Sequence, residues 1–185
     1  MERRHHTGFF GLTLALLALT GFVGSAAAMD LESWDKQIDK ASKRFKVLSD
    51  FNNAAVLDKE TGLVWEKSPG DTDNDTDVDM DDRLTWDNAR FHCVDKAVGG
   101  RKGWRLPSVV ELASLVDPAN SNPALPTGHP FTNIQSTFYW SASALAGFPT
   151  DAWGVFFDGG FVVTREKARE FFVWCVRGPM NADQY

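Results

Sequence analysis

Aspartates crowd into one short stretch of the chain, where seven of them lie between Asp71 and Asp82. Carboxylates this close repel one another, and a divalent cation would relieve that repulsion. Oxygen ligands at alternate positions are typical of calcium sites. The sequence therefore predicts calcium as the one candidate cofactor. Its candidate ligands are the alternate aspartates Asp71, Asp73, Asp75, Asp77 and Asp79.

The register of this loop is like that of an EF-hand starting at Asp71, but two of its elements are missing. Thr76 stands where a glycine should make the sharp turn, and Asp82 replaces the long bidentate glutamate. The alternative is therefore an acidic loop that is solvated and binds no metal.

Basic residues form two small groups. Arg101, Lys102 and Arg105 precede one predicted helix, and a second group comprises Arg165, Lys167 and Arg169. If both groups reach one face, they would contact a sulfated or carboxylated polymer; scattered solvated charge is the alternative. The formal charge of the chain is −6 and no basic stripe occurs, which argues against nucleic acid as a partner.

Two histidines, His92 and His129, are considered as a catalytic base. For His92, beside Cys93 in a predicted helix, a buried imidazole bonded to the backbone is the favoured interpretation, and His129 has no acidic or nucleophilic neighbour in sequence. The sequence contains no G-x-S-x-G elbow, no H-E-x-x-H motif and no phosphate-binding glycine loop. We therefore predict a protein that is not an enzyme. A Ser-His-Asp site assembled from distant residues stays open as an alternative, because such triads form in space rather than in sequence.

The first residues have the pattern of a secretory signal. Arg3 and Arg4 precede an apolar run from Phe9 to Val23, and small residues follow up to Ala28. The pattern predicts cleavage after Ala28 and export to the periplasm or the medium. An uncleaved anchor is the alternative, but the run is shorter than the roughly 20 residues that a spanning helix needs. No later segment is long and apolar enough to cross a membrane.

The chain has two cysteines, Cys93 and Cys175, both in the part predicted to be exported. In an oxidising compartment such a pair is most often a structural disulfide. A redox pair usually has C-x-x-C spacing, and a zinc site needs further ligands. Neither of these alternatives fits the sequence well.

The elements that must position these residues follow from periodicity and turn signals. We expect an amphipathic helix over 31–45, a hairpin of 55–58 and 63–66, and a helix from an N-cap at Thr85 to a stop at Gly99. A second helix begins at Ser108 with a capping box to Glu111. The segment 117–131 is expected to be irregular, and later strands are expected at 138–141, 152–157, 161–164 and 171–177. This order predicts an α+β fold.

Several motifs occur together in a specific order: Thr61–Trp65, Trp86–Cys93, Gly99–Gly100, Trp104–Ser108, Glu111–Leu112, Tyr139–Ser141, Ala152–Trp153 and Cys175–Gly178. The set resembles the Lcl C-terminal domain family, named after a Legionella collagen-like adhesin, over roughly residues 55–178. We accordingly divide the chain into a signal peptide (1–28), an amphipathic helix or linker (29–50), the domain (51–180) and a tail (181–185).

The resemblance implies a C-type-lectin-like fold, similar also to the domains of sulfatase-modifying enzymes. Two helices would pack on a small, mainly antiparallel sheet, with a disulfide from Cys93 on the first helix to Cys175 on the last strand. The calcium-holding Glu-Pro-Asn and Trp-Asn-Asp triplets of sugar-binding lectins are absent from the sequence. Calcium-dependent binding of simple sugars is therefore not implied.

Together these features predict an exported, non-enzymatic binding or adhesion module. Long irregular loops on a cross-linked scaffold suit recognition. The expected partners are envelope or extracellular glycans or a cell-surface protein. The alternative is an enzyme related to the sulfatase-modifying domains, or an unrecognised hydrolase.

Overall fold

The fold combines short helices with antiparallel strands in a computed structural model that describes residues 38, 40–72 and 78–178. The predicted signal peptide lies outside these residues. The helices are α1 (Ala41–Arg44), η1 (Ser49–Phe51, a 3-10 helix), α2 (Trp86–Asp95) and α3 (Val109–Ala113). The strands are β1 (Phe45–Val47), β2 (Ala55–Asp58), β3 (Val64–Glu66), β4 (Phe138–Ala144), β5 (Asp151–Phe156), β6 (Phe161–Glu166) and β7 (Val176–Arg177). The predicted α+β class is confirmed.

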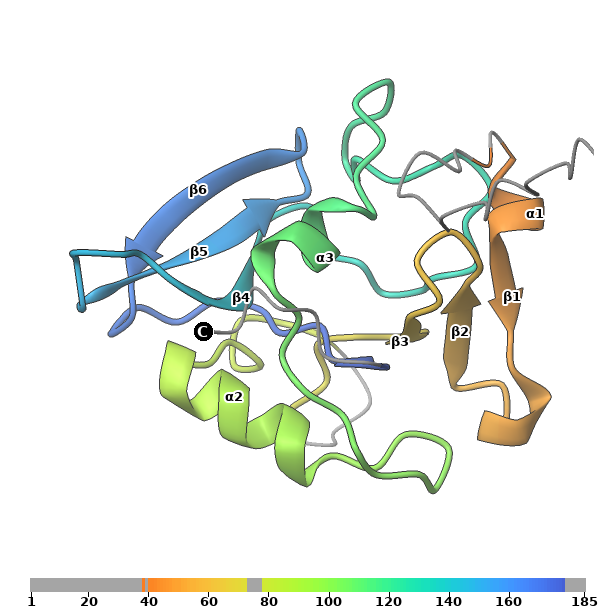
Figure 1. The fold of residues 1–185 in the computed structure, drawn as a ribbon, viewed down its shortest axis with the longest axis horizontal. Helices are drawn as coiled ribbons and strands as arrows, with labels where there is room; N and C mark the ends of the chain where they lie inside the picture. The colour runs from red at the N-terminus through yellow and green to blue at the C-terminus, as the bar shows by residue number, and fades with distance from the viewer. Residues whose placement is uncertain (1–37, 39, 73–77, 179–185) are drawn as a thin grey trace, which may run out of the picture. The chain divides into compact units, whose positions relative to one another are not determined.

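The strands form two antiparallel sheets, with the orders β1-β2-β3-β7 and β4-β5-β6. The predicted hairpin is confirmed as β2 and β3, and Gly62 has the positive φ of 73° that its turn requires. The expectation of a single small sheet is wrong. Figure 1 shows the three-stranded sheet on one side of the molecule and β1, β2 and β3 on the other.

The segment 171–177, expected to be one strand, explains why there are two sheets. Its first part lies beside β4, where the backbone N–H of Trp140 donates to the carbonyl of Phe172 over 3.0 Å. Its last part, β7, pairs with β3 through Val176 and Arg177. One extended segment therefore contacts both sheets in succession, and only its last two residues form a regular strand.

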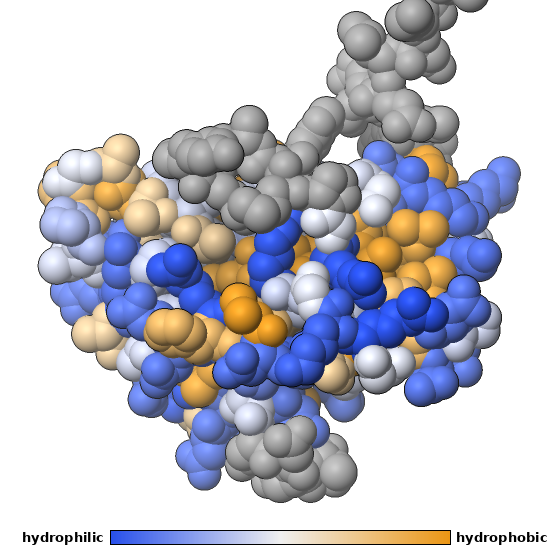
Figure 2. Space-filling view, turned by 60° about the horizontal axis from the view of Figure 1, so that its bottom comes forward, coloured by the Kyte–Doolittle hydropathy of each residue, from blue (hydrophilic) through white to orange (hydrophobic). Residues whose placement is uncertain are grey.

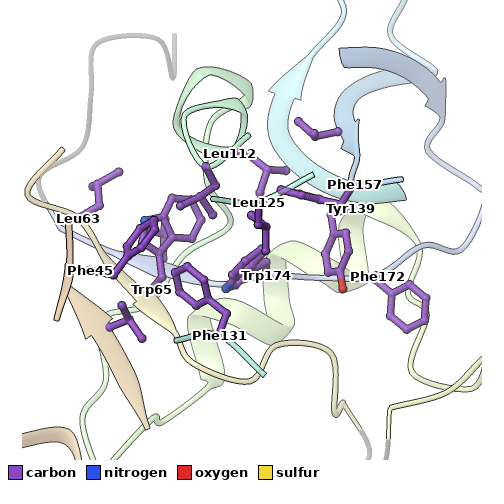
Figure 3. Packing of buried hydrophobic residues seen from close by; sticks show 14 of the residues in the cluster. Phe45, Leu63, Trp65, Leu112, Leu125, Phe131, Tyr139, Phe157, Phe172 and Trp174 are labelled. Atoms are coloured by element: carbon purple, nitrogen blue, oxygen red, sulfur yellow. The ribbon is translucent and has the colours of Figure 1, made fainter. Parts of the chain in front are cut away.

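Hydrophobic side chains fill both faces of this framework. In β4, Tyr139 belongs to one core cluster, whereas its neighbours Phe138 and Trp140 belong to another. Successive residues of a strand point to opposite faces, so a continuous apolar run indicates a strand buried on both sides. Figure 3 shows the first cluster, in which Trp174 and Phe131 lie with their rings at 89°.

The two longer helices cover these clusters separately. Leu112 of α3 belongs to the first cluster, and Ala89 and Cys93 of α2 belong to the second. The predicted capping box of α3 is confirmed, since the N–H of Glu111 donates to Ser108 Oγ over 3.2 Å and Ser108 N–H donates back to Glu111 Oε2 over 2.8 Å. Thr85 occupies the N-cap position of α2, but its side chain makes no capping hydrogen bond.

The segment expected as a helix over 31–45 is only partly helical among the described residues. Ala41–Arg44 form α1, while Phe45 begins β1, which pairs with β2. The Phe45 ring packs on Phe131 at 5.1 Å, a contact with a residue far along the chain. Pairing of Phe45–Val47 with β2 therefore prevails over the helical periodicity of this segment. Strand β1 forms the outer strand of the sheet and lies before residue 51, where the domain was predicted to start.

The predicted disulfide is confirmed: Cys93 of α2 is bonded to Cys175, directly before β7, with a sequence separation of 82. Both cysteines are fully buried in the second cluster. Among the described residues, the helices are too short or too polar to cross a bilayer.

Candidate functional site

The site begins with Phe51, the last residue of η1. The next two residues, Asn52 and Asn53, have φ angles of 51° and 58°, a left-handed conformation that asparagine tolerates better than most residues. This backbone turns the chain back into β2. The Phe51 ring packs edge-on against the buried Trp104 at 6.1 Å.

A tight turn after α2 lies against this position. Val98 and Arg101 exchange both backbone hydrogen bonds at 3.1 Å, and Gly99 and Gly100 between them have φ angles of +58° and +76°. Two successive positive φ angles are the signature of a type I′ turn. A Cβ on Gly99 would collide with the backbone of Phe51, whereas one on Gly100 would meet nothing. Glycine at position 99 therefore lets the turn approach η1 closely.

This turn fixes Arg101 over Phe51. Arg101 Nε donates to the carbonyl of Asp50 over 3.0 Å, and the guanidinium lies 4.9 Å from the centroid of the Phe51 ring. Arg177 of β7 places a second guanidinium 5.7 Å from the same centroid. Lys102 is exposed next to Arg101. We call Phe51, Arg101, Lys102 and Arg177 the Phe51 cation cluster.

Arg105, expected to act with Arg101 and Lys102, has a different environment. Its two terminal nitrogens each donate to a carboxylate oxygen of Glu111 over 2.7 Å. Glu111 is fully buried, and the same carboxylate caps the start of α3. The Arg105 guanidinium therefore stabilises α3, and the structure places it outside the Phe51 cation cluster.

The cations of the cluster have no carboxylate partner among the described residues, where the salt bridges involve Arg44, Lys96 and Arg105. Arg177 was not singled out by sequence reasoning. It reaches the cluster because Val176, its neighbour, exchanges backbone hydrogen bonds with Arg105. No local sequence signal reports such a pairing.

The second basic group stacks on other aromatic rings. Arg165 lies 5.1 Å from the Phe156 ring, and Arg169 lies 5.5 Å from the Phe171 ring. The Lys167 ammonium lies 4.2 Å from the ring of Trp86, the first residue of α2. Arg101 follows the other end of this ten-residue helix, which spans about 15 Å. The two basic groups therefore lie near opposite ends of α2 and do not form one cluster.

The aspartate loop is described only in part, because Asp73, Asp75 and Asp77 lie outside the described residues. The buried Asp82 carboxylate accepts hydrogen bonds from the hydroxyl of Thr72 and the N–H of Asp79, at 3.1 and 2.9 Å.

Within the described ranges, no group of three or more His, Cys, Asp or Glu could hold a metal ion. Calcium binding by the alternate aspartates stays a prediction. A rise in melting temperature at millimolar calcium would support it, and no change would contradict it.

Burial changes the pKa of the two candidate histidines, His92 and His129, in the same direction. Burial, and after it the positive charge of Lys96, lowers the pKa of His92 to about 4. The negative charges of Asp82, Asp71 and Asp95, largest effect first, oppose this shift without reversing it. Burial also lowers the pKa of His129. Nε2 of His92 is buried without a hydrogen-bond partner among the described residues. Both imidazoles are therefore neutral near neutral pH.

The model of the Lcl C-terminal domain family matches residues 54–177. The chain belongs to the Lcl C-terminal domain family. No curated protein matches the chain. Arg101, Lys102 and Arg177 lie inside the matched Lcl C-terminal domain, whereas Phe51, on which two of them stack, precedes it.

Proposed function

We propose that this chain is an exported, non-enzymatic binding module that recognises an acidic glycan of the cell envelope or extracellular medium. The observation that carries the proposal is the pair of guanidiniums, Arg101 and Arg177, stacked on one phenyl ring. A guanidinium presents several N–H donors in a plane, which suits recognition of carboxylate and sulfate groups.

The arrangement supports this function because the cluster is held in place before any ligand binds. The Asp50 carbonyl orients the Arg101 side chain, and Trp104 Nε1 donates to the Arg101 carbonyl over 2.7 Å. Groups ordered in advance lose less conformational entropy on binding. Carboxylate partners would compete with an anionic ligand, and the described residues provide none for Arg101 or Arg177.

The side of the molecule that carries α2 also has exposed hydrophobic side chains. Figure 2 views the side of the molecule that carries α2, where hydrophilic side chains border exposed hydrophobic ones. Phe91 and Val94 of α2 are 70% and 60% exposed. A C-type-lectin-like architecture belongs to the same proposal, and the antiparallel sheets and the disulfide support this architecture. Calcium in the aspartate loop also belongs to the proposal.

The test is chromatography of the full chain on dextran sulfate beads, with unmodified dextran beads as the reference. We expect retention on the sulfated beads that weakens as salt is added, because salt screens exposed charges. The double variant Arg101→Ala/Arg177→Ala should weaken binding roughly tenfold, since it removes two exposed ionic contacts.

A matched control removes the same charge elsewhere. Lys43 and Lys59 are exposed, and Lys43→Ala/Lys59→Ala changes the net charge by the same amount. This control should be retained like the unmodified chain. Passage of the unmodified chain straight through at low salt would contradict the proposal, as would an equal loss of retention in the control.

A further inference from the structure

Strand β6 is the last strand of the β4-β5-β6 sheet, so one side of it has no neighbouring strand. Figure 1 shows β6 on the outside of this sheet. The free side of a strand presents a row of backbone N–H and C=O groups, which can pair with another chain. We call the side of Phe161–Glu166 that is turned away from β5 the β6 edge.

The backbone hydrogen bonds of the β5–β6 hairpin show which residues face the β6 edge. The N–H of Lys167, directly after β6, donates to the carbonyl of Thr150 over 2.8 Å, and this pair continues the register of the two strands. Hydrogen-bonded and non-hydrogen-bonded pairs alternate along an antiparallel ladder. The odd-numbered residues of β6 therefore direct their backbone groups toward β5. Val162 and Thr164 direct theirs to the β6 edge.

The other edge strands of the two sheets are covered or short. The N–H of Trp140 in β4 donates to the carbonyl of Phe172, and Val176 in β7 exchanges backbone hydrogen bonds with Arg105. Strand β1 has three residues and includes the exposed Lys46, and a lysine on an edge discourages pairing. Strand β6 has six residues. It therefore has the longest uncovered edge in the part of the chain that the structure describes.

The β6 edge combines free backbone groups with exposed hydrophobic side chains. Outside the β5–β6 ladder, no hydrogen bond among the described residues engages the N–H of Val162 or Thr164. The carbonyl of Thr164 accepts from Arg165 Nη1 over 2.9 Å, and a carbonyl oxygen has a second lone pair. Phe161 and Val162 are 63% and 44% exposed. An exposed hydrophobic edge of this kind is prone to pair with another chain.

The sequence of β6 is complementary to itself in one antiparallel register. When Val162 lies opposite Thr164 of a second copy, the groups that face the β6 edge exchange both backbone hydrogen bonds. This register also places Phe161 opposite Arg165 of the second copy. Both residues lie on the face of the sheet where Arg165 already stacks on Phe156 at 5.1 Å. A guanidinium is attracted to an aromatic ring, so this contact favours the pairing.

We propose that two copies of this chain form a dimer by antiparallel pairing of their β6 edges. The dimer has twofold symmetry, because each residue of one copy meets the same partner in the other. Val163 lies on the symmetry axis, opposite Val163 of the second copy. A register shifted further along β6 would bring the two Arg165 residues opposite each other, which is a destabilising like-charge pair. This dimer is independent of the acidic glycan proposed above.

The first test is sedimentation velocity of the full chain over roughly 1–100 µM, because a small interface associates weakly. We expect a reversible equilibrium between monomer and dimer. Val162→Lys places a charge on the β6 edge and should weaken dimerisation at least about tenfold. Val94→Lys makes the same change at a 60% exposed residue of α2 and should dimerise like the unmodified chain. A chain that is monomeric throughout, or two lysine variants that behave alike, would overturn the proposal.

The second test measures the register by cross-linking. The proposed pairing makes the two Val163 residues a non-hydrogen-bonded pair, with Cα atoms about 4.5 Å apart, a distance that a disulfide can span. Val163→Cys should therefore give a covalent dimer on a non-reducing gel after mild oxidation. In Thr164→Cys the two thiols are offset along the strands, so cross-linking should be at least about tenfold slower.

The native cysteines do not compete in this test, because Cys93 and Cys175 are buried and bonded to each other. Any covalent dimer of Val163→Cys therefore reports the introduced thiol. No covalent dimer of this variant, or an equal rate for Thr164→Cys, would overturn the proposed pairing.

Discussion

Arg101 and Arg105 lie four positions apart in sequence, yet their guanidiniums have different roles. Arg105 pairs with buried Glu111, while Arg101 stacks on Phe51 beside Arg177. Residue types and local spacing place Arg101 and Lys102 in one basic group because they are adjacent in the sequence. They could not assign the partner of Arg105 or add Arg177, because both depend on where β7 lies. At the scale of residues, the sequence predicts which groups are present but not which groups meet.

His92 should make stability depend on pH. Its folded pKa of about 4 lies below the ordinary value of 6.5, so the unfolded chain takes up a proton first as the pH falls. The stability that His92 contributes is fully present above about pH 6.5 and is lost as the pH falls toward 4. His129 changes the free energy of unfolding with pH in the same direction, because burial also lowers its pKa. The melting temperature measured across this range should therefore decrease as the pH is lowered.

The variant His92→Gln isolates this effect, because glutamine does not titrate. Burial raises the pKa of Glu66, which gives the opposite slope through a separate group. The difference in melting temperature between the variant and the unmodified chain should therefore change only within the His92 window. Parallel curves for the two proteins would show that His92 does not contribute.

At the scale of elements, signals contained within a few residues predicted the structure well. The capping box of Ser108 and Glu111 and the turn at Gly62 depend on contiguous residues, and both are present. The proline-rich segment 117–131 has no helix or strand, as expected, but it buries Leu125 and Phe131 in the first core cluster. Strand β1 and the division into two sheets depend on distant partners, which periodicity does not report.

The turn at Gly99 and Gly100 offers a test of how one element positions another. Gly99→Ala should cost about 2–4 kcal/mol, because its Cβ would collide with the Phe51 backbone and alanine also disfavours the positive φ. Gly100→Ala has the same φ problem but open space, so it should cost only about 1 kcal/mol. Urea unfolding of both variants checks this order, and equal losses would contradict it.

At the scale of the whole molecule, the segment 172–176 joins the two cores. Phe172, Trp174 and Val176 belong to the first cluster, while Val173 and Cys175 belong to the second. This alternation is the ordinary period of an extended chain, used here with both faces buried. The disulfide attaches α2 to this segment at its only cysteine. The sequence predicted the bond, but the position of the segment between two cores required the structure.

Loss of the disulfide should therefore weaken the whole fold rather than one element. The bond spans a sequence separation of 82, and closing such a loop stabilises a protein by roughly 4 kcal/mol in the chain-entropy model, out of a typical total of about 5–15 kcal/mol. Urea unfolding with reductant should show a lower midpoint, and a steeper dependence on urea because the uncrosslinked chain exposes more surface. The double variant Cys93→Ala/Cys175→Ala should show the same change without reductant and no further change with it. An unchanged midpoint after verified reduction would mean that the packing of the two cores, not the bond, sets the stability.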